Sequence, residues 1–508
     1  MKQSDIEAYD ESKHPLSHPR LDQPPTRPPE HLVNGYPGPP IVLASAYPPP
    51  PEALPPAHLL PALPCEQRKP IWDGDARIPY SLTTHIVPAA FWREDPEVEL
   101  PQTAKEGDVL SKEERQKLSA NGEAQLLRMR RGLEDDAAKR ASEGKKRRGH
   151  DKVLWLCFNR YVRCRSTDIE GKNNGLTLFF AHANGFNKET WEPTLAALLS
   201  SPGAQSLIQE IWVWEAANHG DSALLNEGNL NSLFHWRNGA RDLVTFLTHY
   251  LPSRASSEEL PTHLHRLTQS EIAQRQKYGF YDPSCGHKTR TIAAIGHSFG
   301  GCVCTLTSIS SPVSPLPNAN TNFFSLLVLI DPVILYPKPL NHEHPNSLAA
   351  GAFIRRNTWK SREAAKEGFL KSPFFKRWDP RVVDLYVEGG LVKAGSQVHL
   401  KMSPLLEAIA FADTWTGAEE AWVRLWRGEL SAKDVGMRWA VPGTGQKELA
   451  LYPWTTRERV WLRPENADNV RIPGAGHLVP HEKPNELGGL IWEWLSGYFG
   501  YSGQKARL

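Results

Sequence analysis

The sequence predicts an α/β protein whose sheet is mostly parallel and flanked by helices. Short runs rich in β-forming residues recur from residue 152 onward, and amphipathic stretches of helical periodicity lie between them. The runs are nearly continuous in apolar residues, which is typical of strands buried on both faces of a sheet. They read VLWLCFNRYV, LTLFFAH, EIWVWEA, TIAAIGHS and FFSLLVLID. Ligands bind such sheets at the carboxyl ends of the strands, so we expect functional residues there.

Helices are expected between these strands. The stretches Trp191–Leu199 and Trp236–Tyr250 place apolar residues on one face at helical spacing, and so does the run after Ser298. Connections between parallel strands cross over the sheet, so these helices should cover both of its faces.

The alternating pattern lapses after Asp331 and resumes near Met437, where MRWAVPG and then NVRIPG are strand-like. Residues 336–434 between them are rich in Trp and charge and have helical periodicity. This insertion predicts a helical cap placed before the penultimate strand and over the carboxyl edge of the sheet.

Two further segments depart from the core pattern. Seventeen of the 43 prolines fall in the first 64 residues, so we expect residues 1–65 to be a disordered tail, with a PxxP ligand as the alternative. Residues 102–151 combine helix formers with charge and almost no apolar stripe, which indicates an exposed helical insertion. Its Lys145–Arg148 cluster is either a solvated face, a nuclear signal or a contact for an anionic surface.

The composition excludes several classes of protein. The chain has 508 residues with 59 Lys+Arg against 57 Asp+Glu, a balance that argues against nucleic acid as the main partner. The longest apolar stretch, Phe323–Tyr336, is broken by Asp331 and Pro332, so no membrane span is expected. Six cysteines without zinc or disulfide spacing, and no apolar leader, favour a reducing compartment. We expect no metal and no cofactor, since neither a ligand cluster nor a nucleotide-binding loop is present.

The motif Gly296-His297-Ser298-Phe299-Gly300 follows the strand TIAAI and precedes a helix-compatible run. A serine at such a strand-to-helix turn is raised into an exposed elbow, the geometry that a nucleophilic hydroxyl needs. A helix N-cap serine in a glycine-rich turn is the alternative.

A second loop supports the nucleophile. His182-Ala183-Asn184-Gly185-Phe186 follows the strand LTLFF, at the place where a loop donates backbone amides to a developing oxyanion. We assign the oxyanion hole to the backbone N–H groups of Asn184 and Phe299. The alternative is a tight turn that merely needs Gly185.

The base and the acid should come later in the chain. His477, in IPGAGH, follows a predicted strand and is flanked by glycine; His481 is its competitor. Asp331 closes the apolar strand FFSLLVLID, where a carboxylate is costly to bury without a function, so we assign it as the acid. Glu448 is the fallback, and a helix-capping role is the alternative for Asp331.

These motifs together resemble the α/β-hydrolase superfamily, and more closely a fungal peroxisomal group with lipases, toxin-biosynthesis hydrolases and the mycophenolic acid acyl-CoA hydrolase. The resemblance rests on GHSFGG, HANGFNKETWEP, ANHGDSALLNEG, LIDPVI and IPGAGHLVPHEKP and covers roughly residue 80 to the C-terminus. It implies an α/β-hydrolase fold and an acid after the sixth strand, consistent with Asp331. THIVPAAFWRE resembles the group's first strand. The expected segments are therefore 1–65 (tail), 66–101 (first strand region), 102–151 (insertion), 152–335 (core), 336–434 (cap), 435–500 (core) and 501–508 (C-terminal tail).

The resemblance implies a serine hydrolase that cleaves carboxylic esters or acyl thioesters through an acyl-enzyme. An acyltransferase on the same fold and a non-catalytic binding protein stay open as alternatives. The expected partners are a small acyl substrate and, because Ala506-Arg507-Leu508 is similar to a peroxisomal address, an import receptor. The oligomeric state stays open. Several aromatic residues of the cap should form its core and line an acyl pocket: Phe353, Trp359, Phe369, Phe374, Phe375, Trp378, Phe411 and Trp415.

Overall fold

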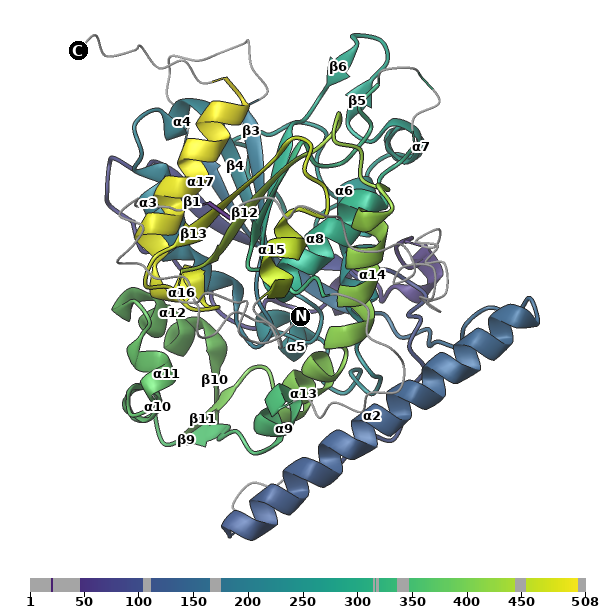
Figure 1. The fold of residues 1–508 in the computed structure, drawn as a ribbon, viewed down its shortest axis with the longest axis vertical. Helices are drawn as coiled ribbons and strands as arrows, with labels where there is room; N and C mark the ends of the chain where they lie inside the picture. The colour runs from purple at the N-terminus through teal and green to yellow at the C-terminus, as the bar shows by residue number, and fades with distance from the viewer. Residues whose placement is uncertain are drawn as a thin grey trace.

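In a computed structural model of the protein, the structure describes residues 20–21, 46–103, 111–164, 175–313, 316, 319–335, 347–443 and 454–500. An eight-stranded sheet runs through its centre, in the order β1-β2-β4-β3-β7-β8-β12-β13 (Figure 1). β2 is antiparallel to both of its neighbours, and all the other pairs are parallel. The predicted mostly parallel sheet is confirmed. The strands are β1 (Tyr80–Pro88), β2 (Trp155–Arg163), β3 (Leu176–Ala181), β4 (Ile208–Trp214), β7 (Ile292–His297), β8 (Leu326–Ile330), β12 (Gly436–Pro442) and β13 (Ala467–Ile472).

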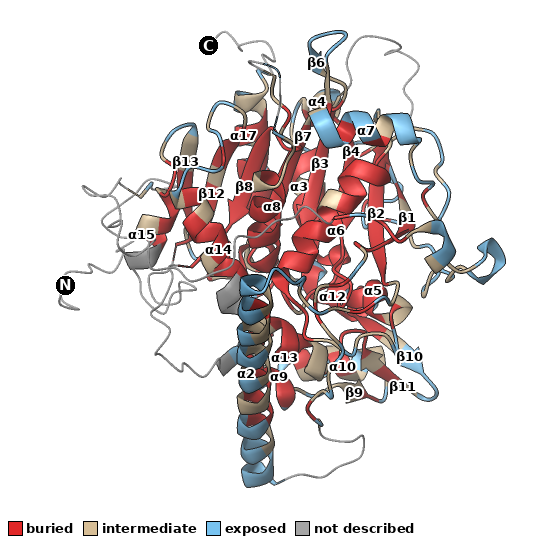
Figure 2. Cartoon of the chain, turned by 90° about the vertical axis from the view of Figure 1, so that its right-hand side faces the viewer, coloured by how far each residue is buried: buried red, intermediate tan, exposed pale blue. Residues whose placement is uncertain are grey.

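The sheet is buried on both faces, as the apolar runs predicted. Every residue of β3, β7 and β8 is buried, and these strands appear red in Figure 2. α3 (Glu192–Leu199) and α17 (Pro484–Tyr498) contribute to one apolar cluster. α6 (Trp236–His249), α8 (Phe299–Ile309) and α14 (Thr414–Trp426) contribute to the other, on the opposite face (Figure 1).

Shorter elements connect these layers. They are the 3₁₀ helix η5 (Lys188–Trp191), α4 (Ala204–Leu207), α5 (Gly220–Leu225), α7 (Gln269–Tyr278), β5 (Tyr281–Asp282), β6 (His287–Lys288), α15 (Trp454–Val460) and α16 (Val479–Glu482).

The insertion between β8 and β12 is not purely helical, which corrects the expected helical cap. It contains a three-stranded sheet in the order β10-β11-β9. A hairpin joins β10 to β11 through Gly395, whose φ of 59° suits the tight turn, but the surrounding helical periodicity hid this signal. The elements before β12 are α9 (Ser347–Phe353), β9 (Thr358–Trp359), α10 (Arg362–Leu370), α11 (Pro373–Lys376), α12 (Pro380–Gly390), β10 (Leu391–Ala394), β11 (Gln397–Leu400), α13 (Pro404–Ala412) and then α14.

Within residues 102–151 the structure has one long helix, α2 (Lys112–Ser142), which lies along α9 and α13 (Figures 1 and 2). Ser111 and Glu114 form a capping box at its start. Arg130 of α2 forms an ion pair with Asp413 at 2.8 Å, and Ser119 donates to the carbonyl of Ala350 at 2.5 Å. The insertion is therefore attached to the cap by side chains of α2.

The N-terminal segment departs from the disordered tail expected over residues 1–65. From Ala46 onward the chain lies on the body, with the 3₁₀ helices η3 (Pro51–Ala53) and η4 (Ala57–Leu59). The prolines exclude regular ladders, but the leucines between them serve as apolar anchors. Leu54, Leu60 and Leu63 pack against the cluster of Ile86, Trp155 and Cys157.

Among the residues described, no helix is long and apolar enough to cross a membrane.

Candidate active site

Ser298 lies at a sharp turn between β7 and α8. Its φ of 54° and ψ of −116° are strained values for a residue with a side chain, as expected of a nucleophile elbow. The glycines around it permit close backbone contacts. A Cβ atom on Gly296 would lie 2.6 Å from the carbonyl oxygen of Gly300, and one on Gly300 would lie 2.6 Å from the carbonyl oxygen of His182. The turn therefore requires glycine at both positions.

The structure brings Ser298, His477 and Asp331 together. His477 Nε2 lies 3.0 Å from Ser298 Oγ, and His477 Nδ1 lies 2.7 Å from Asp331 Oδ2. Because a carboxylate oxygen only accepts, Nδ1 donates to Asp331 and Nε2 is free to accept the serine proton. The three side chains come from the ends of β7, β8 and β13, all at the carboxyl edge of the sheet.

Asp331 is a fully buried carboxylate with a φ of 34°. Burial by itself raises the pKa of Asp331, but Arg459 and then His477 outweigh it, and the net effect lowers the pKa. The carboxylate is therefore ionised and available to orient an imidazole. Sequence reasoning missed Arg459, which lies on α15 and donates from Nη2 to Asp331 Oδ1 at 2.6 Å.

The loop assigned to the oxyanion hole lies against the start of α8. The amide of Gly300 donates to the carbonyl of His182 at 3.1 Å, and the amide of Gly185 donates to Nε2 of His219 at 3.1 Å. Within the described part of the chain, the amides of Asn184 and Phe299 have no acceptor, so both are available to a ligand. His219 was not identified from the sequence.

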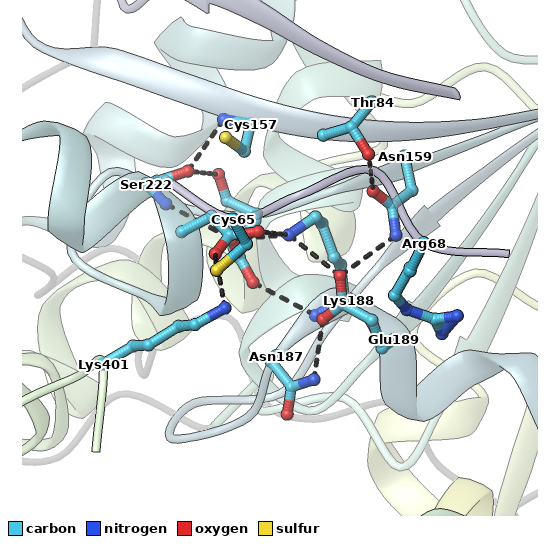
Figure 3. Close-up of polar contacts among 12 residues, drawn as sticks. Cys65, Arg68, Thr84, Cys157, Asn159, Asn187, Lys188, Glu189, Ser222 and Lys401 are labelled. Atoms are coloured by element: carbon cyan, nitrogen blue, oxygen red, sulfur yellow. Dashed lines mark hydrogen bonds and ion pairs between the residues drawn. The ribbon is translucent and has the colours of Figure 1, made fainter. Parts of the chain in front are cut away.

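A buried cluster of charges, the Lys188 cluster, fixes the end of this loop (Figure 3). Lys188 Nζ lies 3.0 Å from Glu189, 3.2 Å from Glu215 and 2.6 Å from Asp221. Lys401, from the cap, pairs with Asp221 at 2.5 Å. Burial raises the pKa of Glu215 to about 7, against the opposing effect of Lys188. The cluster joins the oxyanion loop to the body and to the cap.

His481, the competitor for the base, packs against aromatic rings. His481 packs between Phe186 and Trp378, with ring centroids 4.3 and 4.5 Å away, and burial lowers the pKa of His481 to about 3. His481 therefore serves the packing of these rings. Glu448 lies outside the described residues.

The aromatic residues of the cap fall into two groups, because Phe353 and Phe411 pack with the large core cluster whereas Trp359, Phe369, Phe375 and Trp378 pack on one another. Phe369, Phe375 and Trp378 belong to one buried cluster, and the centroids of Phe369 and Phe375 are 4.7 Å apart. The side chain of Trp415 lies outside the described residues. A recess of about 280 Å³ separates the oxyanion loop from the cap, and an ion pair forms part of its wall. Its lining includes Phe186, Leu400, Met402, Arg355 and Glu407.

No group of three His, Cys, Asp or Glu side chains in the described ranges is arranged to hold a metal ion.

Comparisons with known proteins bear on the family and the fold. Residues 178–487 match the model of the Alpha/beta hydrolase family. The chain is 27% identical over 209 residues to the Peroxisomal membrane protein LPX1 of Saccharomyces cerevisiae, covering 41% of this chain and 44% of that protein. It is also 27% identical over 217 residues to the Type I acyl-CoA thioesterase mpaH of Penicillium roqueforti, covering 42% and 39%. These matches span less than half the length of either relative.

Among solved structures, the peroxisomal alpha-beta-hydrolase Lpx1 of S. cerevisiae superposes with a TM-score of 0.54 at 18% identity, over 84% of this chain and 91% of that one. This likeness supports the fold. The family model covers more than half of the chain, and the sheet order and the elbow match the predicted α/β-hydrolase fold. The chain therefore belongs to the alpha/beta hydrolase family.

Proposed function

We propose that the protein is a serine hydrolase that cleaves carboxylic esters or acyl thioesters through an acyl-enzyme. Ser298 is the nucleophile, His477 the general base and acid, and Asp331 the orienting acid. The observation that carries the proposal is the continuous contact from Ser298 Oγ through both nitrogens of His477 to Asp331, at 3.0 and 2.7 Å.

In the first half-reaction, Nε2 of His477 takes the proton of Ser298 Oγ while the oxygen attacks the substrate carbonyl carbon. The tetrahedral intermediate collapses as Nε2–H protonates the leaving alkoxide or thiolate, and the acyl group stays on Oγ. In the second half-reaction a water molecule gives its proton to Nε2 and attacks the acyl carbon. The acid product leaves, and the serine regains its proton.

The negative charge of the intermediate develops on the carbonyl oxygen. The free amides of Asn184 and Phe299 are proposed to bind that oxygen, because Asn184 lies within the oxyanion loop and Phe299 begins α8. Fixed donors of this kind contribute about 3–4 kcal/mol each to lowering a barrier.

The substrate class rests on the chemistry of the site and on the relatives. One relative is named an acyl-CoA thioesterase, and ester and thioester cleavage use the same groups. Purified protein should be assayed against p-nitrophenyl esters of increasing chain length, triacylglycerols and acyl-CoAs. If acyl groups of several carbons are the substrates, kcat/KM rises with chain length before levelling off. A flat profile would point to a small or polar acyl group.

Ser298→Ala tests the nucleophile, with Ser308→Ala as the matched control, because Ser308 is a buried serine of the same helix that bonds Asn322 at 2.9 Å. Ser298→Ala should abolish turnover and fluorophosphonate labelling at an unchanged Tm, whereas Ser308→Ala should keep both activities. Labelling of Ser298→Ala at the wild-type rate would show that another residue is the nucleophile.

We further propose a peroxisomal location, which the similarity to a protein named as peroxisomal supports. The terminal tripeptide Ala506-Arg507-Leu508 lies outside the described residues. An N-terminal fluorescent fusion should enter peroxisomes, and Leu508→Lys should move it to the cytosol. Import of the Leu508→Lys fusion would contradict the address.

A further inference from the structure

Arg459 contacts the carboxylate of Asp331 on the oxygen that His477 does not use. The side chain is buried, with 3% of its surface exposed. Its Nη2 donates to Asp331 Oδ1 at 2.6 Å, while Oδ2 accepts from His477 Nδ1 at 2.7 Å. One oxygen of the proposed acid thus bonds a permanent cation and the other bonds the proposed base.

The same guanidinium also holds the backbone next to the acid. Nη1 of Arg459 donates to the carbonyl of Pro332 at 2.5 Å. Asp331 has a φ of 34°, a strained value for a residue with a side chain, so its turn needs support from its surroundings. The planar guanidinium donates to the carboxylate and to the following carbonyl at the same time. These two hydrogen bonds fix both the turn and the rotation of the carboxylate.

We propose that Arg459 is a positioning residue, which holds the carboxylate of Asp331 in the orientation that accepts the hydrogen bond from His477 Nδ1. Its kinetic readout rests on the proposed hydrolase function.

Other ionisable groups also face this site. His297 from β7 donates to the carbonyl of His477, and His481 from α16 lies near the ring of His297. Glu482 accepts from the amide of Gly476 at 2.8 Å and pairs with Arg377 at 2.7 Å. All of them are unchanged in variants of Arg459, so a difference in kcat between variants reports the arginine.

The variants are Arg459→Met, which removes both the charge and the planar pair of N–H donors, and Arg459→Lys, which keeps only the charge. Arg463→Met is the matched control, because Arg463 is 5% exposed and its nearest described acceptor is the carbonyl of Ser431 at 3.5 Å. Values of kcat and KM for p-nitrophenyl butyrate are measured across the pH range, with folding checked by circular dichroism.

Arg459→Met should lower kcat at neutral pH by about tenfold, with KM within about twofold, because the carboxylate is no longer held toward the imidazole. Arg459→Lys should keep most of this loss in kcat, because an ammonium lacks the planar pair of donors that a guanidinium has. Arg463→Met should keep the wild-type kcat and KM. Full wild-type kcat in Arg459→Met or in Arg459→Lys would overturn the proposal.

A measurement without turnover separates this proposal from the proposed function. The Nδ1–H proton of His477, assigned by its absence in His477→Gln, is observed by NMR in the wild type, Arg459→Met and Arg459→Lys. Its signal reports the hydrogen bond to Asp331, so it should weaken in both variants even if the protein hydrolyses no ester. An unchanged signal in all three proteins would overturn the role of Arg459. If Arg459→Met does not fold, the signal and the kcat of Arg459→Lys decide.

Discussion

His297 donates a hydrogen bond from its Nε2 to the backbone carbonyl of His477, at 2.9 Å. The residue that precedes the proposed nucleophile in the chain therefore holds the loop that carries the proposed base. His297 is buried, and burial, followed by the nearby His477 and His481, lowers its pKa well below the ordinary value. It stays neutral and keeps its proton on Nε2, because a carbonyl can only accept.

Replacing His297 with Leu should lower kcat by about fivefold to tenfold, since the loss of one hydrogen bond loosens the loop of His477. His481→Phe is the control, because His481 packs among aromatic rings and phenylalanine preserves that packing. Kinetics of p-nitrophenyl ester hydrolysis measure both. A larger loss in His481→Phe than in His297→Leu would mean that the base has been misassigned.

Asp331→Asn should reduce kcat by about 10³- to 10⁴-fold, because an amide no longer holds the imidazole in the tautomer that leaves Nε2 free. The fold should persist, since asparagine has nearly the same shape. Glu448→Gln is the companion variant and should keep wild-type turnover. The reverse result would place the acid after β12 instead of after β8.

Truncation of the N-terminal segment should act in two steps. Removing residues 1–65 should lower the Tm by several degrees more than removing residues 1–45, because the longer deletion also strips Leu54, Leu60 and Leu63 from their apolar cluster. Differential scanning calorimetry of both proteins measures the difference. Equal melting temperatures would show that the contacts of residues 46–65 contribute no stability.

Lys288 should make stability depend on pH above neutrality. Its Nζ donates to the carbonyl of Asn322 at 2.8 Å and to Ser325 at 3.1 Å, and burial lowers the pKa of Lys288 from 10.5 to about 7. A lysine whose pKa falls on folding binds fewer protons in the folded state than in the unfolded state between these two values. Its contribution to stability therefore rises with pH across that interval and is constant below it.

Urea unfolding of the wild type and of Lys288→Met tests this pH dependence. The unfolding free energy of the wild type minus that of Lys288→Met should increase as the pH increases from about 7 to about 10. Lys277→Met, at an exposed position of α7, should run parallel to the wild type. If the unfolding free energy of Lys288→Met also ran parallel to that of the wild type across this pH range, the result would contradict the lowered pKa of Lys288.

The sequence predicted those features that depend on neighbours in the chain. Apolar runs marked the strands, since a strand buried on both faces needs them along its whole length. Glycines around Ser298 marked the elbow, because a strand-to-helix turn with close backbone contacts tolerates no larger side chain. Asp331 and His477 were chosen because each follows a strand, and strand ends meet at one edge of the sheet.

Contacts between distant segments could not be predicted from the sequence. Arg459, His297 and Lys188 have ordinary sequence surroundings, and their roles arise only from partners far along the chain: Asp331, His477 and Asp221. The packed N-terminal segment and the hairpin of the cap also escaped prediction, since prolines and helical periodicity dominated the local pattern.

The sequence by itself determined which residue types stand at the strand ends of this protein. Only the tertiary structure decided that Ser298, Asp331 and His477 meet, because 179 residues separate the serine from the histidine and 146 separate the aspartate from it. The order of the strands in the sheet brings these three side chains together. Strand order results from packing both apolar faces of the sheet at once, a condition that no local stretch of sequence expresses.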